Sequence, residues 1–261
     1  MCDALFVAYC LKILNNPSKL NIFVNKLALM KKKIFAVEIL RVLKKNYAYR
    51  ELSKMINLPP SVLSRYINGH VIPSIEKAEM IIETFKENYL REVLRSKVIE
   101  RNGAYDLTSV CYDAGLQQLI AKCVAGEFEL IKVDKILTAA VDGIPIAIQL
   151  GNELGVKSIV VAKGTKEVGV EEFLEEKAVF SPVIFKTFYI PKGSIKKDEN
   201  VLVVDDIMRT GATLEAMVRL VEKSKANVAG IFTLFSVRNC EEELKKRLGL
   251  KCKVISFLNL S

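Results

Sequence analysis

Residues 201–213 read Val-Leu-Val-Val-Asp-Asp-Ile-Met-Arg-Thr-Gly-Ala-Thr. The apolar, mostly β-branched run at 201–204 predicts a parallel strand that is buried on both faces. Asp205 and Asp206 follow at the carboxyl end of that strand, which is the end where open α/β sheets bind ligands. A short loop of small and hydroxyl residues then leads into a segment with the apolar spacing of an amphipathic helix.

The loop at 209–213 has the composition of a phosphate site. A helix amino terminus entered through a glycine turn presents unpaired N–H groups and the positive end of the helix dipole. Adjacent carboxylates suit the vicinal hydroxyls of a ribose, or a divalent cation, better than they suit phosphate. We therefore expect ribose 5-phosphate chemistry here. The alternatives are a solvated acid pair before an ordinary helix cap, a phospho-acceptor aspartate, or a site for Mg²⁺ alone.

This stretch resembles the phosphoribosyl-pyrophosphate (PRPP) motif of type I phosphoribosyltransferases: an apolar run, Asp-Asp, two residues, a basic or polar residue, then Thr-Gly-x-Thr. The resemblance implies that the ligand is contacted by Asp205, Asp206, Met208, Arg209, Thr210, Gly211, Ala212 and Thr213. It also implies that Mg²⁺ can accompany bound PRPP, while no resident metal or other cofactor is required.

Two further loops resemble parts of the same transferase site. The loop formed by Ala140, Val141, Asp142 and Gly143 follows a predicted strand and resembles the pyrophosphate loop, whose backbone N–H groups hold the diphosphate. Asp142 is an unfavourable neighbour for a diphosphate unless a metal or Lys163 offsets its charge. Lys163 matches a basic position of the family that contacts diphosphate, and the alternative is an ordinary surface lysine.

The basic surplus of the chain is confined to one segment. Residues 31–103 carry fifteen Lys and Arg against eight Asp and Glu, a net charge of +7, whereas residues 104–261 carry twenty-one of each. A local surplus favours a polyanionic partner for that segment alone, although a merely solvated basic face gives the same count.

Within this basic segment, residues 49–58 and 60–69 predict two short helices joined by a tight turn at Asn57. Their order resembles the helix-turn-helix of the phage Cro and repressor family, which usually has Gly where this chain has Asn57. The resemblance implies that the second helix enters the major groove of double-stranded DNA. The groove-facing residues would be Ser61, Val62, Ser64 and Arg65, the phosphate-side residues Lys54, Asn68 and His70, and Arg50 could serve either role. The alternative is a helical hairpin with no nucleic-acid role.

The fold class that we predict is α plus α/β: a helix-turn-helix bundle followed by a doubly wound, mostly parallel sheet. The expected parts are an N-terminal extension at 1–30, a helix-turn-helix domain at 31–89, a linker helix at 90–103 and an α/β domain at 104–261. The linker helix is expected to stop at Asn102-Gly103. Strands are expected at 136–141, 158–162, 183–190, 201–204, 228–237 and 253–258. Helices are expected at 31–45 and 110–124, and Ser74 can cap a further helix.

The six cysteines are scattered, with no C-x-x-C pair and only one histidine in the chain. This distribution argues against a zinc site and a secreted disulfide framework, and favours reduced thiols in a cytoplasmic protein. No apolar run has the length of a membrane span, so no membrane partner is expected.

Taken over residues 31–261, the chain resembles archaeal orotate-phosphoribosyltransferase-like transcriptional regulators, and also bacterial purine repressors built on the same fold with a different DNA-binding domain. The resemblance implies a homodimeric DNA-binding regulator, without a catalytic residue set, that senses PRPP, a nucleotide or a phosphorylated sugar and controls sugar or nucleotide metabolism. The segment 164–182 matches the mobile hood of the enzymes, yet residues 167–176 carry five glutamates and no base, which suits a departing diphosphate poorly. Two alternatives remain: an active, orotate-type phosphoribosyltransferase with an accessory DNA-binding domain, and a nucleic-acid-binding module on a structural body.

Overall fold

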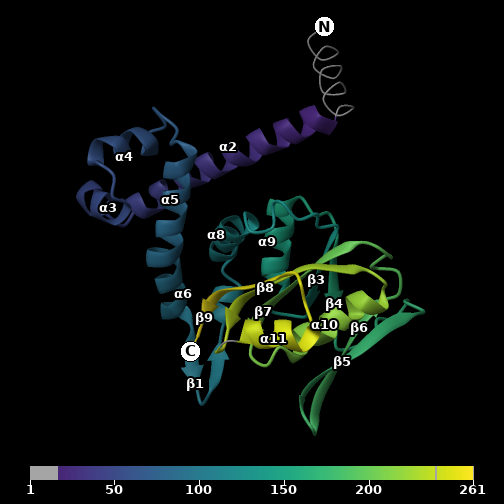
Figure 1. The fold of residues 1–261 in the computed structure, drawn as a ribbon. Coiled ribbons are helices and arrows are strands. Elements are labelled where there is room, and N and C mark those ends of the chain that lie inside the picture. The colour runs from purple at the N-terminus through teal and green to yellow at the C-terminus, as the bar shows by residue number, and fades with distance from the viewer. Residues whose placement is uncertain (1–16, 239, 261) are drawn as a thin grey trace. The chain divides into compact units, whose positions relative to one another are not determined.

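The computed structural model describes residues 17–238 and 240–260 (Figure 1). The chain divides into two compact units between Glu92 and Val93. Residues 1–16 of the expected N-terminal extension lie outside the described residues.

The first unit is helical. Its helices are α2 (Pro17–Lys44), α3 (Tyr49–Ile56), α4 (Pro60–Ile67) and α5 (Ile75–Phe85), and a π-helical turn (Lys86–Leu90) leads into α6 (Arg91–Lys97). The unit is held by fully buried apolar side chains, among them Ile39, Leu43, Leu52, Leu63 and Ile81. The predicted helix at 31–45 is therefore part of a longer helix that begins at Pro17, because residues 18–44 contain no glycine or proline to interrupt it.

The turn between α3 and α4 has the predicted geometry. Asn57 ends α3 in the left-handed conformation, with φ 53° and ψ 44°, so it substitutes for the glycine that is usual in this turn. Pro60 occupies the first turn of α4, where its missing N–H costs no hydrogen bond. The predicted cap of the next helix is also present, since the Ser74 hydroxyl accepts a hydrogen bond from the Lys77 N–H at 3.4 Å.

The prediction that a linker helix runs to residues 102–103 is wrong. Helix α6 ends at Lys97, and strands β1 (Ile99–Arg101) and β2 (Ala104–Asp106) form an antiparallel hairpin instead. Asn102 and Gly103 form its two-residue turn with φ of 52° and 76°, the pair of positive angles for which Asn-Gly is preferred. The same dipeptide can end a helix or turn a hairpin, and only the pairing of 99–101 with 104–106 distinguishes the two.

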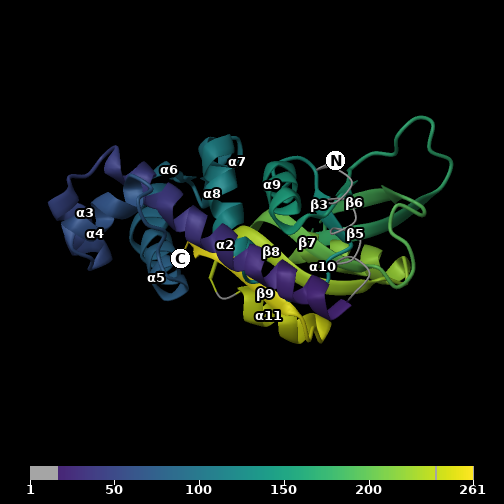
Figure 2. The same cartoon turned by 90° about the horizontal axis from the view of Figure 1, so that it is seen from above.

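The second unit is built on a five-stranded parallel sheet with the order β4-β3-β7-β8-β9. The strands are β3 (Lys135–Ala139), β4 (Ile159–Ala162), β7 (Asn200–Met208), β8 (Asn227–Ser236) and β9 (Lys253–Asn259). The helices are α7 (Thr108–Cys111), α8 (Ala114–Ala125), α9 (Ile144–Leu154), α10 (Ala212–Lys223) and α11 (Cys240–Leu248). Figure 2 shows α8 and α9 on one face of the sheet and α10 and α11 on the other, which confirms the predicted doubly wound fold.

The strand order places the predicted loops together. The chain leaves β3 toward β4 on one side of the sheet, and leaves β7 toward β8 on the other side. The carboxyl ends of β3 and β7, which are neighbours in the sheet, are therefore the point where the connections diverge. Ligands of open α/β sheets bind in the crevice at such a switch point.

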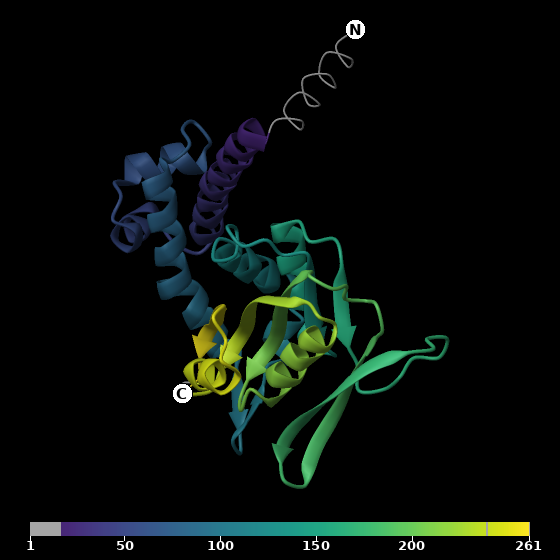
Figure 3. The same cartoon turned by 45° about the vertical axis from the view of Figure 1, so that its right-hand side comes forward.

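In the second unit one predicted helix is divided in two, and one strand was not predicted. The helix expected over 110–124 is broken into α7 and α8, because Asp113 caps the second helix by accepting a hydrogen bond from the Leu116 N–H at 3.1 Å. The segment expected as a mobile hood contains a regular strand, β5 (Phe173–Ser181), which pairs antiparallel with β6 (Ile184–Pro191). This hairpin projects from the edge of the sheet in Figure 3. It is joined to the carboxyl end of β4 by two backbone hydrogen bonds between Lys163 and Tyr189.

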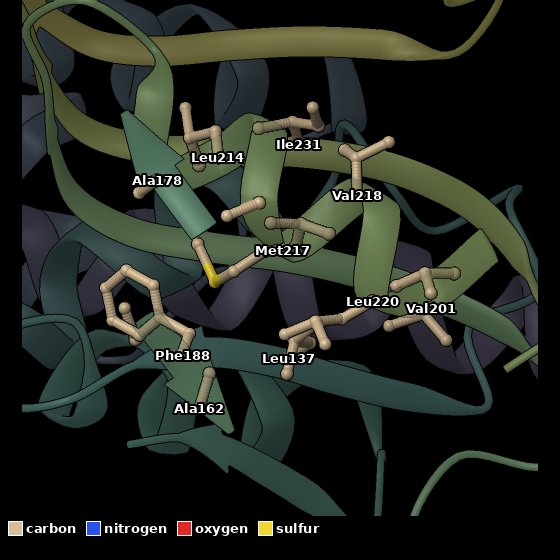
Figure 4. Close-up of a cluster of buried hydrophobic side chains, with 14 of the residues drawn as sticks. Leu137, Ala162, Ala178, Phe188, Val201, Leu214, Met217, Val218, Leu220 and Ile231 are labelled. Atoms are coloured by element: carbon tan, nitrogen blue, oxygen red, sulfur yellow. The ribbon is translucent and has the colours of Figure 1, made fainter. Parts of the chain in front are cut away.

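The core under the candidate site is apolar and continuous. Figure 4 shows Met217, Val218 and Leu220 of α10 packed toward Leu137 and Val201 of the sheet and toward Phe188 of the hairpin. Each of these six side chains is at most 1% exposed. The core therefore fixes the start of α10 relative to the end of β7. No helix in the described part of the chain combines the length and the apolar character needed to cross a membrane.

Candidate functional site

Strand β7 continues beyond the predicted end at Val204 and carries both acids within it. It runs to Met208, with Asp205 opposite Thr233 of β8. A cavity of about 350 Å³ opens beside this end of the strand. It is lined by Phe180, Asp205, Asp206, Ile207, Met208, Arg209, Thr210, Gly211, Ala212, Thr213 and Leu214. Every residue assigned to the PRPP motif thus borders one cavity, whose volume lies near the lower end of the range for small-ligand sites.

Gly211 makes the turn that starts α10. Its φ of 75° is in the left-handed region, and a Cβ there would lie 3.0 Å from both Arg247 Nη2 and Leu244 Cδ1. Only glycine meets both conditions without strain. The turn aims the amino terminus of a twelve-residue helix at the cavity, as the sequence pattern predicts for an anion site.

Helix α11 holds the outer side of this loop. Cys240 Sγ lies 2.7 Å from the carbonyl oxygens of both Arg209 and Val237, to either of which its S–H can donate, and Arg247 Nη2 donates a hydrogen bond to the Thr210 carbonyl oxygen at 3.0 Å. Arg247 Nε also lies 2.9 Å from Glu215 Oε2 in the first turn of α10. Two consecutive loop carbonyls therefore contact α11.

The loop amides have little competition from the protein itself. The Ala212 N–H donates to the Thr210 hydroxyl at 3.3 Å, while the N–H groups of Thr210, Gly211 and Thr213 have no acceptor within residues 17–238 and 240–260. Unpaired amides at a helix start attract an anion.

The two acids lie in contrasting surroundings. Asp205 is 5% exposed and Asp206 is half-buried, and Asp205 Oδ1 accepts a hydrogen bond from the Asp206 N–H at 3.1 Å. Burial raises the pKa of the Asp205 carboxyl well above its usual value, and the charges of Asp206 and Asp142 raise it further. Burial likewise raises the pKa of Asp206. Sugar hydroxyls that donate to the carboxylates would replace the lost hydration and favour the ionised forms.

The loop at 140–143 adjoins Asp205. A Cβ at Gly143 would lie 2.5 Å from Thr138 Oγ1 and 3.0 Å from Asp205 Oδ1, so the backbone approaches the acid as closely as a glycine allows. The peptide bond between Ala140 and Val141 is cis. Asp142 Oδ1 accepts a hydrogen bond from the Tyr112 hydroxyl at 2.6 Å, which holds its carboxylate on the exposed side of the loop.

Cys111 is a buried thiol beside Tyr112, the residue that holds Asp142. Burial raises the pKa of Cys111 to about 12, with further contributions from the charges of Asp206, Asp142 and Asp205. Cys111 is therefore a thiol at neutral pH and no nucleophile.

The described residues contain no preformed group of three or more metal-ligating side chains. An accompanying Mg²⁺ would consequently need phosphate or sugar oxygens of the ligand in addition to the carboxylates.

Lys163 follows β4 at the carboxyl edge of the sheet, two strands from β7, and it is not among the cavity residues. Its Nζ forms an ion pair with Glu167. Three more glutamates of this segment form ion pairs with lysines. Glu172 pairs with Lys192, Glu175 with Lys166 and Glu176 with Lys223. Four of the five glutamates at 167–176 therefore have a lysine partner, and one of these partners is Lys166 at the edge of the segment.

Some cavity residues were not found from the sequence. Phe180 reaches the cavity from β5, which the sequence pattern did not identify as a strand, and Ile207 and Leu214 adjoin motif residues. Tyr105 of the unpredicted hairpin stacks with Arg209, whose guanidinium carbon lies 5.9 Å from the ring centroid. By contrast, Met208 and Ala212 border the cavity with side chains that are only 1% and 8% exposed, so these two residues can offer it mainly backbone atoms.

The residues proposed for DNA contact lie on α3, on α4 and just beyond α4. Arg50, Lys54, Ser61, Arg65, Asn68 and His70 are exposed, and Val62 and Ser64 are half-buried. Asn68 Nδ2 donates a hydrogen bond to Ser64 Oγ at 3.2 Å, and Arg41 Nε donates one to the Ile67 carbonyl oxygen at 2.9 Å. The end of α4 is therefore held by α2, while Ser61 in its first turn and Arg65 in its last turn remain accessible.

A parallel sheet with an acid pair and a glycine turn before a helix at its switch point is the arrangement of ligand-binding α/β domains. Residues 112–257 match the family described as phosphoribosyl transferase domain, so the chain belongs to that family. Residues 37–89 match a helix-turn-helix family.

Known proteins of two kinds are similar to this chain. The purine biosynthesis transcriptional repressor PurR of Bacillus subtilis is 26% identical over 209 residues, which are 79% of this chain and 70% of PurR. The hypoxanthine/guanine phosphoribosyltransferase of Methanothermococcus okinawensis is 27% identical over 179 residues, which are 64% of this chain and 92% of that enzyme. The names of these relatives refer to purines, not to orotate.

Solved structures of adenine phosphoribosyltransferases have the same fold. The enzyme from Thermoanaerobacter pseudethanolicus has a TM-score of 0.57 at 23% identity, covering 65% of this chain and 99% of the enzyme. The enzyme from Trypanosoma brucei, solved with AMP, pyrophosphate and ribose-5-phosphate, has a TM-score of 0.56 at 13% identity and covers 67% of this chain and 81% of that enzyme.

Proposed function

We propose that this protein is a DNA-binding transcriptional regulator whose phosphoribosyltransferase-like domain binds a phosphorylated ribose ligand as an effector. The observation that carries the ligand class is the cavity that brings Asp205 and Asp206 together with the loop at 209–213. Buried carboxylates suit donated hydroxyls, and loop amides without protein partners suit a phosphate. Purine names among the relatives favour control of nucleotide metabolism over control of sugar catabolism.

The DNA-binding half of the proposal is supported by the helix-turn-helix match and by charge. The basic surplus of +7 falls within residues 31–103. Helix α4 would enter the major groove, where Arg65 and Ser61 would reach base edges and Lys54 and His70 would lie beside phosphates. These four side chains lie on α3, on α4 and just beyond α4. DNA binding would depend on salt concentration, because basic side chains neutralise DNA phosphates.

Regulators of this type act as dimers, because a helix-turn-helix pair reads two half-sites one helical turn apart. We propose a homodimer in which ligand favours one arrangement of the two α4 helices over another. Such a ligand changes DNA affinity only by the difference between its affinities for the two arrangements.

The test measures DNA binding and ligand binding on the same full chain. Fluorescence anisotropy with a labelled duplex from upstream of its own gene is recorded at several salt concentrations, with and without PRPP, ribose 5-phosphate, AMP and GMP. We expect salt-sensitive binding that at least one of these ligands changes by fivefold or more, on the order of 1 kcal/mol of coupling. Binding that none of them alters would remove the sensing function, and no DNA binding at all would remove the regulatory one.

The second candidate is an active phosphoribosyltransferase of purine type with an accessory DNA-binding domain. It is favoured by the acid pair and phosphate loop, which in an enzyme would hold the ribose as its anomeric carbon loses diphosphate. Diphosphate release from PRPP with adenine, hypoxanthine, guanine or orotate would support this candidate, provided that the Asp205→Asn variant loses it.

A further inference from the structure

We propose that Asp142 makes the effector pocket select ribosides that carry a single 5′-phosphate, such as ribose 5-phosphate or a nucleoside 5′-monophosphate, over ligands with a diphosphate on the anomeric carbon. This inference rests on the proposed effector function and specifies the ligand class of the same cavity.

The position of Asp142 follows from the geometry of a bound ribose 5-phosphate. If the loop at 209–213 holds the 5′-phosphate and the acid pair holds the ring hydroxyls, the anomeric carbon lies next to the acids, because it is bonded to the carbon that carries the 2-hydroxyl. Gly143 contacts Asp205 directly. Residues 140–143 do not line the cavity, so we infer that a substituent on the anomeric carbon, which extends beyond the ribose ring, meets this loop and its Asp142 carboxylate.

That carboxylate is fixed in place. The Tyr112 hydroxyl donates a hydrogen bond to Asp142 Oδ1 at 2.6 Å, and both side chains are exposed toward solvent. A diphosphate adds several negative charges beside Asp142, and like charges at close range repel even near a protein surface. The same carboxylate does not oppose a neutral hydroxyl or an uncharged base at the anomeric carbon.

The basic groups that could offset Asp142 are engaged elsewhere. Lys163, which the sequence pattern assigns to the diphosphate, forms an ion pair with Glu167. Lys166 lies 3.4 Å from Glu175 Oε2 and also stacks over the Tyr189 ring at 5.1 Å. Each lysine would have to leave its carboxylate partner before it could neutralise a diphosphate. Arg209 lines the cavity and belongs to the loop that would hold the 5′-phosphate, and its guanidinium lies over the ring of Tyr105.

The cavity also offers an apolar side chain to an uncharged substituent. Phe180 lines the cavity and is 44% exposed, so its ring is available to a planar base. The cavity of about 350 Å³ is at the small end of ligand sites, in keeping with a monophosphate ligand.

Ribose 5-phosphate and PRPP form a matched pair of probes, because they share the sugar and the 5′-phosphate and differ in the diphosphate. Isothermal titration of the full chain with each, in EDTA to remove divalent cations, gives the ratio of their dissociation constants. We expect PRPP to bind about tenfold more weakly than ribose 5-phosphate, as one unfavourable charge contact of about 1.4 kcal/mol requires. The Asp142→Asn variant should reduce this ratio severalfold. The control is Asp198→Asn, which removes an exposed carboxylate elsewhere in the same unit and should leave the ratio unchanged.

The outcomes separate this inference from the proposed function. If neither probe, nor AMP or GMP, binds to the folded wild-type chain, the effector function itself fails. If ribose 5-phosphate binds but PRPP binds as tightly or more tightly, the selectivity is overturned while the effector function stands. A wild-type preference that Asp142→Asn does not reduce would overturn the assignment to Asp142. Circular dichroism of each variant establishes that a changed ratio comes from folded protein.

Discussion

Arg247 of α11 bridges the two sides of the phosphate loop: Nη2 donates a hydrogen bond to the Thr210 carbonyl oxygen at 3.0 Å, and Nε lies 2.9 Å from Glu215 Oε2. One side chain thus fixes the loop before Gly211 and the helix turn after it. Arg247 contacts the outer side of the loop, and it does not line the cavity. Arg247 is a positioning residue for the anion site.

The Arg247→Ala variant should bind ribose 5-phosphate about fivefold more weakly, because the ion pair and the hydrogen bond are partly exposed and together contribute about 1 kcal/mol to loop order. The matched control is Lys246→Ala on the same helix, which removes an exposed charge of the same sign. Isothermal titration measures both. Equal effects of the two variants would mean that overall charge, not loop position, determines affinity.

The Gly211→Ala variant should lose roughly 2–5 kcal/mol of unfolding free energy, combining the cost of a left-handed alanine with overpacking against Leu244. Gly249→Ala is the control, since Gly249 has φ 61° and nothing lies within 4 Å of the added methyl. That variant should lose only about 1–2 kcal/mol. Urea unfolding of both variants checks the difference, and similar losses would show that the packing contact at residue 211 is unimportant.

The raised pKa of Asp205 predicts a stability that falls as pH rises. The unfolded chain ionises this carboxyl near pH 4 and the folded chain only at higher pH, so between the two pKa values unfolding releases a proton. The Asp205→Asn variant should therefore be more stable than wild type at neutral pH, with an advantage that disappears toward pH 4. It should also bind ribose 5-phosphate roughly tenfold or more weakly, because it loses a charged acceptor.

Asp134 provides a control of opposite sign. Its pKa is lowered, chiefly by the hydrogen bond that it accepts from the Asn200 N–H at 2.9 Å. The stability that the ionised Asp134 carboxylate contributes to the folded chain is present at neutral pH and is lost on acidification. The Asp134→Asn variant should therefore be less stable than wild type at neutral pH. Thermal unfolding from pH 4 to pH 8 compares the two variants with wild type. If Asp205→Asn is less stable than wild type at neutral pH, ionisation of Asp205 does not destabilise the folded chain and the prediction is wrong.

The Arg65→Ala variant should weaken binding to the specific DNA site by about 1–3 kcal/mol, whereas Lys54→Ala should weaken binding to any duplex and reduce the salt slope by about 1. The charge-matched control is Lys197→Ala in the second unit, where Lys197 is an exposed side chain. Fluorescence anisotropy on specific and scrambled duplexes at several salt concentrations distinguishes the two effects. A loss of affinity with Lys197→Ala equal to that with Arg65→Ala would contradict the placement of DNA on α4.

Local patterns predicted those parts of the protein whose conformation depends on neighbours in the chain. Asn57 has the left-handed φ expected of an inter-helical turn, and Ser74 caps α5. The order of strand, acids, loop and helix around residues 201–213 is also as predicted, although β7 extends through the acids to Met208. Turn geometry and helix capping are set by a few adjacent residues, so a single sequence reveals them.

Parts that depend on distant partners were not predicted. Asn102-Gly103 turns a hairpin instead of ending a helix, because residues 99–101 find their partners in 104–106. Phe180 joins the cavity through the pairing of β5 with β6, and Glu167 neutralises Lys163. No periodicity in the sequence carries these contacts.

The sequence by itself therefore determined the order of residues at the candidate site: two adjacent acids, a glycine turn and a helix start. Only the tertiary structure decided its surroundings, by placing β3 beside β7 so that the loop bearing Asp142 contacts Asp205, and by packing Arg247 behind Thr210. The physical reason is range. Hydrogen bonding within a turn is a property of adjacent residues, whereas strand order and the fields of neighbouring charges arise when segments far apart in sequence are brought together.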